Sequence, residues 1–307
     1  MHHPPPPATG APRRGVALGV LLGLAFGASC AHTSSAVTTA ELLSMVRNEP
    51  VPAGHVACAV FDADETLWEF DLSKTVTEQA VRNRTASDQG LPAFNALFQT
   101  FGLPTAASIY DAKAELEAAW FSGRLHQAGR QRGWDEDAVN VREWAHYNWL
   151  FVGETPAALG ARARQLMVEQ GYREKVFPGI RTLLGALRAA QFRVRVISGG
   201  VHELVQVAAA DLGLSTDEVR GLRTEVRDGC LTAEVIAPVP YKQGKAELAQ
   251  QMCGGVPMFA FGDSVASGDS AMLQAAAIPV AVRPKGRHLT AALDRAMRIW
   301  EHPEATE

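Results

Sequence analysis

Short apolar runs alternate with longer amphipathic segments over much of the chain. The apolar runs have the length of buried strands and lie at 56–61, 192–197, 257–261 and 278–282. Apolar residues recur at helical spacing at 179–190, 201–213, 244–252, in the stretch ending near 277, and at 290–299. Strands separated by helices predict a parallel sheet that is covered on both faces. The expected fold class is therefore α/β, with a doubly wound core.

From about residue 74 to 176 the pattern is helical and rich in charge. The segments 104–121 and 135–151 carry apolar residues at helical spacing. This block follows the first strand, so we expect an inserted α-helical cap of residues 74–176 on a core built from 36–73 and 177–307. Smaller elements are also expected: a helix at 38–48 with a threonine cap, and two short β segments around the turn at 227–229.

The first 31 residues are expected to be a signal peptide rather than part of the fold. Two arginines at 13–14 precede an apolar run at 15–27, which is shorter than the roughly 20 residues of a membrane-spanning helix. Cleavage after Ala31 would release a periplasmic protein. Cleavage before Cys30 would leave a lipid anchor, since GASC resembles a bacterial lipoprotein box, although an aliphatic residue is usual where Gly27 stands. Both outcomes predict export.

Composition and charge narrow the function classes. With 47% hydrophobic and 20% charged residues the chain can bury an ordinary globular core. A net charge of −4 gives no general attraction to nucleic acid or to an anionic membrane, so an anionic substrate needs a local site. Cys58, inside the first strand, is predicted to be a buried free thiol. Cys230 and Cys253 could pair after export, but their spacing alone does not establish a disulfide.

Polar clusters follow three of the predicted strands. Asp62 and Asp64 follow the first, the segment 198–200 follows the second, and Asp263 follows the third, with Asp269 six residues later. In parallel sheets ligands bind at the carboxyl ends of the strands. Neighbouring carboxylates repel one another unless a cation compensates them, and Mg²⁺ prefers such oxygen ligands. The pattern therefore predicts a magnesium site at this edge.

The same edge offers donors for a phosphate. Ser198 and the amides of Gly199 and Gly200 stand near a helix start. Either Lys242 or Lys245, at the start of another helix, adds positive charge. Metal, lysine, amides and hydroxyl all neutralise phosphoryl oxygens, and a carboxylate can then attack phosphorus.

At these positions the sequence resembles the haloacid dehalogenase-like hydrolases, and within them the phosphoserine phosphatase-like branch. The resemblance rests on FDADET at 61–66, VISGG at 196–200, Lys245 in QGKAEL, and FGDSVASGDSAML at 261–273. Together the similar stretches cover 56–71 and about 176–283, whereas the cap agrees only in position and helical character. The resemblance implies the Rossmann-like core of that family.

The resemblance implies a role for each carboxylate. Asp62 would be the nucleophile that forms an aspartyl-phosphate and would also ligate Mg²⁺. Asp64 would protonate the leaving alcohol and then deprotonate the attacking water, with its backbone carbonyl on the metal. Haloacid dehalogenases lack an acid at this position and phosphonatases carry alanine there, so hydrolysis of a phosphomonoester is indicated.

The other implied site residues bind either the phosphoryl group or the metal. Those on the phosphoryl group would be Thr66, Ser198, Gly199 and Lys245, and those on the metal would include Asp263 and Asp269. The two acids of this last motif usually stand four or five positions apart, so a spacing of six requires an enlarged loop.

Trp68, Phe70 and Asp71 follow the first motif and bear on the substrate. Asp71 stands at the offset of the acid that meets the substrate ammonium in phosphoserine phosphatases, and aromatic rings beside an acid suit a cationic head group. This predicts a small phosphomonoester with an amine or quaternary ammonium, similar to phosphoserine or phosphorylcholine. Alternatively, the aromatic residues pack at a hinge into the cap.

Two other functions remain open. One is a phosphatase for a larger phosphorylated target, which a closing cap disfavours. The other is a non-catalytic exported protein that keeps the fold and binds a ligand. The tryptophans at 120, 134, 144 and 149 are expected to build the cap core, and His202 is expected to lie on a helix face. The expected partner is a small phosphorylated metabolite, without nucleic acid and with the membrane reached only through Cys30.

Overall fold

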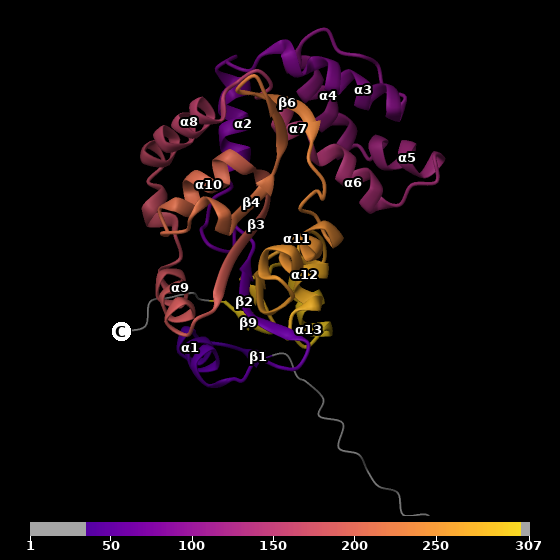
Figure 1. The fold of residues 1–307 in the computed structure, drawn as a ribbon. Helices are drawn as coiled ribbons and strands as arrows, with labels where there is room; N and C mark the ends of the chain where they lie inside the picture. Colours follow the sequence, from indigo (N-terminus) through magenta and orange to yellow (C-terminus); the bar gives the residue numbers. More distant parts are fainter. Residues whose placement is uncertain (1–34, 302–307) are drawn as a thin grey trace, which may run out of the picture. The chain divides into compact units, whose positions relative to one another are not determined.

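A sheet of seven strands forms the centre of the part of the chain that the computed structural model describes, residues 35–301. The predicted signal peptide and Cys30 lie outside the described residues. The strand order is β1-β9-β8-β7-β2-β3-β4, and neighbouring strands run parallel (Figure 1). The strands are β1 (Ser35–Ala36), β2 (His55–Phe61), β3 (Arg193–Val201), β4 (Val219–Leu222), β7 (Val256–Gly262), β8 (Ile278–Val282) and β9 (Arg298–Trp300). The predicted α/β class with a parallel sheet is confirmed.

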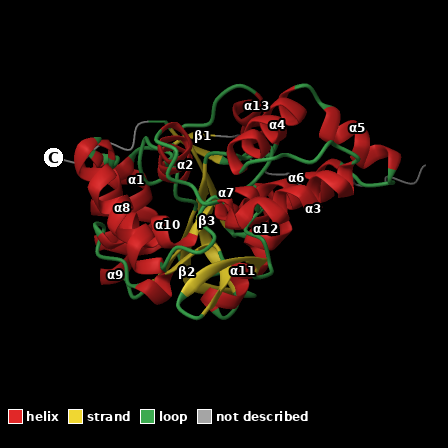
Figure 2. Cartoon of the chain, turned by 90° about the horizontal axis from the view of Figure 1, so that it is seen from above, coloured by secondary structure: helices red, strands yellow, loops and turns green. Residues whose placement is uncertain are grey.

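Helices cover both faces of this sheet (Figure 2). One face carries α1 (Thr39–Asn48), α8 (Pro156–Glu169), α9 (Pro178–Ala189) and α10 (His202–Ala210). The other carries α11 (Gln243–Cys253), α12 (Ser270–Ala275) and α13 (Arg287–Asp294). Side chains of β2 alternate between the faces: Ala59 and Phe61 join the first apolar cluster, and Cys58 and Val60 join the second. All four are fully buried, as expected for a central strand covered on both sides.

The C-terminal prediction was partly wrong. The expected helix at 290–299 is replaced by α13, which ends at Asp294, and by the strand β9. Ile299 and Trp300 are buried, and Trp300 pairs with Val282 of β8. These residues form a strand because they pair with β8 at the side of the sheet. A strand of three residues is too short to give a recognisable pattern in the sequence.

A second helical group packs around its own apolar cluster, with Phe94, Phe98 and Leu116 at its centre. The helices that follow β2 are α2 (Leu72–Arg82), α3 (Leu91–Phe101), α4 (Ile109–Phe121), α5 (Arg124–Gln131), α6 (Glu136–Trp144) and α7 (His146–Trp149). Short 3₁₀ turns lie at Asp88–Gly90, Tyr172–Lys175 and Thr216–Glu218. We refer to α3–α7 as the helical cap.

The hairpin around residues 227–229 is confirmed, as β5 (Thr224–Arg227) and β6 (Cys230–Val235). It packs against the cap, since Ala233 and Val235 touch the cap cluster and the Trp149 indole donates to the Ala233 carbonyl at 3.1 Å. Helix α8 instead packs on α10, and its Leu159 and Leu166 belong to the core cluster. No helix among residues 35–301 is both long and apolar enough to cross a membrane.

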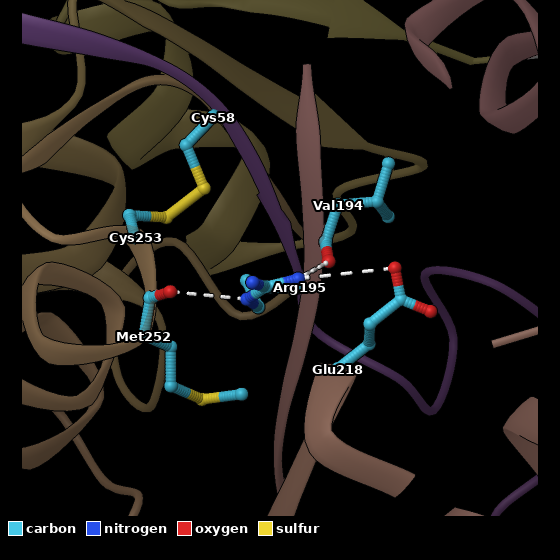
Figure 3. The surroundings of a disulfide bond; sticks show 6 residues. All are labelled: Cys58, Val194, Arg195, Glu218, Met252 and Cys253. Atoms are coloured by element: carbon cyan, nitrogen blue, oxygen red, sulfur yellow. Dashed lines mark hydrogen bonds and ion pairs between the residues drawn. A yellow bond between two sulfur atoms is a disulfide. The ribbon is translucent and has the colours of Figure 1, made fainter. Parts of the chain in front are cut away.

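A disulfide joins Cys58 of β2 to Cys253 at the end of α11 (Figure 3). The prediction of a free thiol at Cys58 was therefore wrong. The pairing of Cys230 with Cys253, which the spacing had left open, does not form. Cys230 bonds to no other cysteine of the described chain. Cys58 faces α11 because alternation along β2 turns its side chain to that side. Beside the bond, Arg195 donates to the Met252 carbonyl at 3.0 Å.

Candidate active site

The carboxyl ends of β2, β3 and β7 meet under the cap at a cavity of about 390 Å³. The core contributes the side chains predicted from the strand ends: Asp62, Asp64, Ser198, Gly199, Lys245 and Asp263. The cap contributes Trp120, Glu136, Asn140, Trp144 and Tyr147. A larger hollow of about 800 Å³ lies between α8 and α10, but it contains none of the predicted chemistry.

Asp62 is buried directly after β2, where its N–H continues the ladder to the Phe261 carbonyl at 2.9 Å. Its Oδ1 accepts a hydrogen bond from Lys245 Nζ at 2.5 Å, and its Oδ2 accepts one from Thr66 Oγ1 at 3.4 Å. Burial, followed by the charge of Asp269, raises the pKa of Asp62 to about 6 against the opposing effect of Lys245. Thr66 is fully buried and contacts Asp62 rather than the cavity.

Lys245 is the lysine that the structure places among the acids. It lies in the first turn of α11, is almost fully buried, and bridges Asp62 and Asp269. Burial disfavours the charged lysine, but the carboxylates of Asp269 and Asp62 outweigh that effect and raise its pKa. Lys242 instead forms an ion pair with Asp137 of α6.

Three carboxylates converge as a candidate metal site. One oxygen each of Asp62, Asp263 and Asp269 lies within 4.8 Å of the others. The long loop between the last two acids turns back on itself, and Asp269 Oδ2 accepts hydrogen bonds from the Ser264 amide at 2.9 Å and hydroxyl at 2.8 Å. Burial and then the charges of Asp269 and Asp62 raise the pKa of Asp263 to about 8. A single lysine does not balance three acids, so this donor set suits a hard divalent cation.

Asp64 lies beside this group with its carboxyl group on the cavity wall. Its Oδ1 accepts hydrogen bonds from the Trp68 indole at 2.8 Å and from the Leu72 amide at 3.4 Å. Burial raises the pKa of Asp64 well above its usual value, and the charges of Asp71 and Asp62 add to the effect. A raised pKa favours the protonated form, which is the form that a general acid needs.

The last residues of β3 carry the predicted phosphate donors, because the strand extends past the expected end at residue 197 to Val201. The Ser198 hydroxyl accepts the Gly200 amide at 3.0 Å, and the Gly199 carbonyl accepts the Trp144 indole at 2.7 Å. A side chain at position 199 would place its Cβ 2.8 Å from the Trp144 ring nitrogen, so glycine fits under the cap where a larger residue does not. The end of β3 and helix α6 of the cap are thus in direct contact at this site.

Two of the residues predicted to meet a substrate head group are elsewhere. Trp68 is fully buried and Phe70 nearly so, and neither lines the cavity. Both rings pack edge-on against Tyr172, at centroid distances of 5.4 and 6.2 Å, so the packing alternative describes them correctly. Asp71 does lie on the cavity wall, where it also caps α2 by accepting the Lys74 amide at 2.8 Å.

The cap supplies aromatic residues that the sequence reasoning assigned to the cap core. Trp149 is buried in the cap cluster and Trp134 packs against it, as predicted. Trp120 also packs against this cluster, but it lines the cavity as well, and Trp144 lines the cavity without belonging to the cluster. Their spacing along α4 and α6 is the same whether they face the core or the cavity, so the sequence carried no signal that separates the two pairs. His202 lies outside the cavity wall and accepts the Gly221 amide at 3.1 Å.

Comparison with known proteins adds sequence and fold relationships. The family of haloacid dehalogenase-like hydrolases matches residues 59–274. A phosphoserine phosphatase of Idiomarina loihiensis is 37% identical over 113 residues, 35% of this chain and 50% of that protein. One from Mycobacterium tuberculosis is 36% identical over 117 residues, 36% of this chain and 27% of that protein. The chain therefore spans half or less of these curated relatives.

A solved structure agrees in fold. The crystal structure of a protein of unknown function from Bordetella pertussis covers 79% of this chain and 97% of that one, with a TM-score of 0.58 and 18% sequence identity. At this identity the likeness concerns the fold alone.

Proposed function

The chain belongs to the haloacid dehalogenase-like hydrolases, and from this premise we propose that it is a Mg²⁺-dependent phosphatase of small phosphomonoesters. The observation that carries the proposal is the pairing of buried Asp62 with Lys245 beside a second carboxyl group, Asp64, in one cavity. This arrangement has a nucleophile, a fixed positive charge and a proton donor at one cavity.

The proposed reaction has two halves. Asp62 attacks phosphorus to form an aspartyl-phosphate while the bond to the leaving alcohol breaks, and Asp64 gives its proton to that alcohol. Asp64, now ionised, takes a proton from water as the water attacks the aspartyl-phosphate, which restores both carboxyl groups and releases phosphate. Lys245 and the amides after Ser198 compensate the charge of the phosphoryl oxygens.

The carboxylates of Asp62, Asp263 and Asp269 would hold the Mg²⁺ ion. When bound, the ion supplies positive charge that compensates these acids and the phosphoryl group. The convergence of these three carboxylates supports the fit: burial, and after it the charge of the neighbouring acids, raises the pKa of Asp62 and of Asp263, and a cation would offset both effects. Asp269 would help to hold the ion, directly or through a water, while it also pairs with Lys245.

We further propose a substrate with a cationic head group, similar to phosphoserine or phosphorylcholine. Trp120, Trp144 and Tyr147 line the cap side of the cavity together with Asp71 and Glu136. Aromatic faces beside carboxylates attract ammonium groups. The curated relatives named phosphoserine phosphatases support an amine-bearing substrate, and the enclosed volume supports a small one.

We also propose that the protein is exported. The disulfide between Cys58 and Cys253 supports an oxidising compartment, as does the predicted signal peptide. A lipid anchor at Cys30 stays a prediction.

The proposed reaction is tested by hydrolysis of p-nitrophenyl phosphate with and without Mg²⁺, in wild type and in Asp62→Asn. We expect Mg²⁺-dependent release of phosphate that the variant lacks. A wild type without any such activity would contradict the proposal and favour a ligand-binding protein. The substrate class is tested with phosphoserine, phosphorylcholine and glycerol phosphate. Asp71→Asn should reduce activity on the two cationic substrates and leave glycerol phosphate unchanged, and an equal effect on all three would contradict it.

A further inference from the structure

The buried indole of Trp68 contacts the group that we propose as general acid. Trp68 Nε1 donates to Asp64 Oδ1 at 2.8 Å, and the Leu72 amide approaches the same oxygen at 3.4 Å. Within residues 35–301, no side chain or amide donates to Asp64 Oδ2. Resting on the proposed function, we propose that Trp68 is a positioning residue that determines which oxygen of Asp64 carries the transferred proton.

The proton location follows from hydrogen-bond chemistry. A protonated carboxyl group has one O–H donor, and its remaining lone pairs accept. Because Asp64 Oδ1 already faces two N–H donors, a proton on that oxygen would oppose them. The proton therefore belongs on Oδ2, the oxygen that neither N–H group occupies. As the alcohol departs, the Oδ2–H bond breaks, a new O–H bond forms on the alcohol, and the two N–H groups stabilise the resulting carboxylate.

The indole is held by the core and not by the substrate. Its backbone pairs with Val176 just before α9. A backbone hydrogen bond lies on either side of this pair: Phe177 N–H donates to the Leu67 carbonyl at 3.1 Å, and Glu69 N–H donates to the Lys175 carbonyl at 2.8 Å. The ring packs edge-on against Tyr172, whose hydroxyl donates to the Ala208 carbonyl of α10 at 3.2 Å. Trp68 has no exposed surface. A donor fixed in this way is in place before a substrate binds, as an effective catalytic arrangement requires.

If Trp68 had only a structural role, its substitution would affect the rates of different substrates in a different way. Loss of packing alone would change the amount of folded enzyme, or the cavity as a whole, and would slow all substrates by a similar factor. Loss of a correctly placed proton matters only when the leaving group needs that proton. Alkyl phosphates release a strongly basic alkoxide unless it is protonated, whereas p-nitrophenolate leaves readily without a proton.

The test is Trp68→Phe in the full chain with Mg²⁺. Phenylalanine keeps an aromatic ring against Tyr172 but removes the N–H donor. The measured quantity is kcat/KM for p-nitrophenyl phosphate and for glycerol phosphate, because kcat/KM covers the steps up to departure of the alcohol and excludes hydrolysis of the intermediate. General acid catalysis typically contributes about 10²–10⁴-fold, so losing its alignment should lower kcat/KM for glycerol phosphate about tenfold or more. The value for p-nitrophenyl phosphate should change by less than about threefold.

Two further variants complete the design. Asp64→Asn gives the full loss of the acid and sets the upper limit of the effect. Phe70→Leu is the matched packing control, since Phe70 also packs on Tyr172 but has no bond to Asp64. It should leave the ratio of the two kcat/KM values unchanged. That ratio does not depend on the concentration of folded enzyme, so partial unfolding of Trp68→Phe does not obscure the result.

The outcomes separate this inference from the proposed function. If wild type hydrolyses neither substrate with Mg²⁺, the proposed function is wrong, and the inference is wrong with it. If wild type hydrolyses both and Trp68→Phe lowers both by the same factor, or lowers neither, the positioning role is wrong while the phosphatase proposal stands. A selective loss on glycerol phosphate that Phe70→Leu does not share supports the role.

Discussion

The disulfide between Cys58 and Cys253 closes a large loop, and its effect on stability can be estimated from the chain. The two cysteines are 195 residues apart, and both are fully buried between β2 and α11. A chain-entropy estimate for a loop of this size gives about 5 kcal/mol of stabilisation at 25 °C, and measured values for disulfides are typically about 2–4 kcal/mol. Reduction should therefore lower the free energy of unfolding by about 2–5 kcal/mol.

The bond also links two elements of the site. Strand β2 ends at Phe61, next to Asp62, and α11 carries Lys245 in its first turn. The cross-link joins the middle of β2, at Cys58, to the last residue of α11, Cys253. Reduced protein should therefore lose activity at a lower denaturant concentration than oxidised protein.

The assay is guanidinium unfolding of the full chain, followed by circular dichroism, with and without reductant. Thiol titration of the unfolded chain reports the state of the bond. The sequence holds four cysteines, so unreduced protein can present at most two reactive thiols and reduced protein up to four. Cys230→Ser is the control, because Cys230 bonds to no described cysteine and should leave the free energy of unfolding within about 0.5 kcal/mol.

Two results would refute this reasoning. Four reactive thiols in the unfolded, unreduced chain would show that the bond is absent. A confirmed bond whose reduction leaves the unfolding midpoint unchanged would show that the loop does not restrict the unfolded chain as argued.

Three further predictions concern charge and metal binding. Burial lowers the pKa of His202 to about 3, so below pH 6.5 the unfolded chain binds a proton that the folded chain does not, and the free energy of unfolding falls as the pH drops. At pH 5 this loss is about 2 kcal/mol by linkage. Urea unfolding at pH 7.5 and at pH 5 should therefore show a smaller loss in His202→Gln than in wild type. Lys245→Met leaves the buried carboxylates of Asp62 and Asp269 without their positive partner. The free energy of unfolding in the absence of Mg²⁺ should therefore fall by about 3–5 kcal/mol, and a fall of less than about 1 kcal/mol would contradict this argument. Mg²⁺ at about 100 times its Kd should stabilise the protein by about 2.7 kcal/mol in thermal unfolding. Asp263→Asn should reduce that stabilisation, and an equal stabilisation in the variant would show that Asp263 does not bind the metal.

The sequence alone determined the approximate ends of β2, β7 and β8 and which polar residues lie near the ends of β2, β3 and β7, although β3 runs on through Ser198 to Val201. Apolar runs and helical spacing are local patterns, and parallel strands bring their carboxyl ends to one edge, so Asp62, Asp64, Ser198 and Asp263 could be placed together in advance. The helical block after β2 was recognisable for the same reason.

Only the tertiary structure decided which side chains face one another across that edge. It showed Lys245 against Asp62, as the family resemblance had implied where position along the helix alone left Lys242 open, and it joined Cys58 to Cys253 across 195 residues. It also showed that the aromatic residues of the cavity wall are not the predicted ones, because Trp68 is buried in the core while Trp144 of α6 lines the cavity. Spacing along a strand or helix gives the face on which a residue lies, but the neighbour on that face comes from a distant segment, and its position depends on how the elements pack.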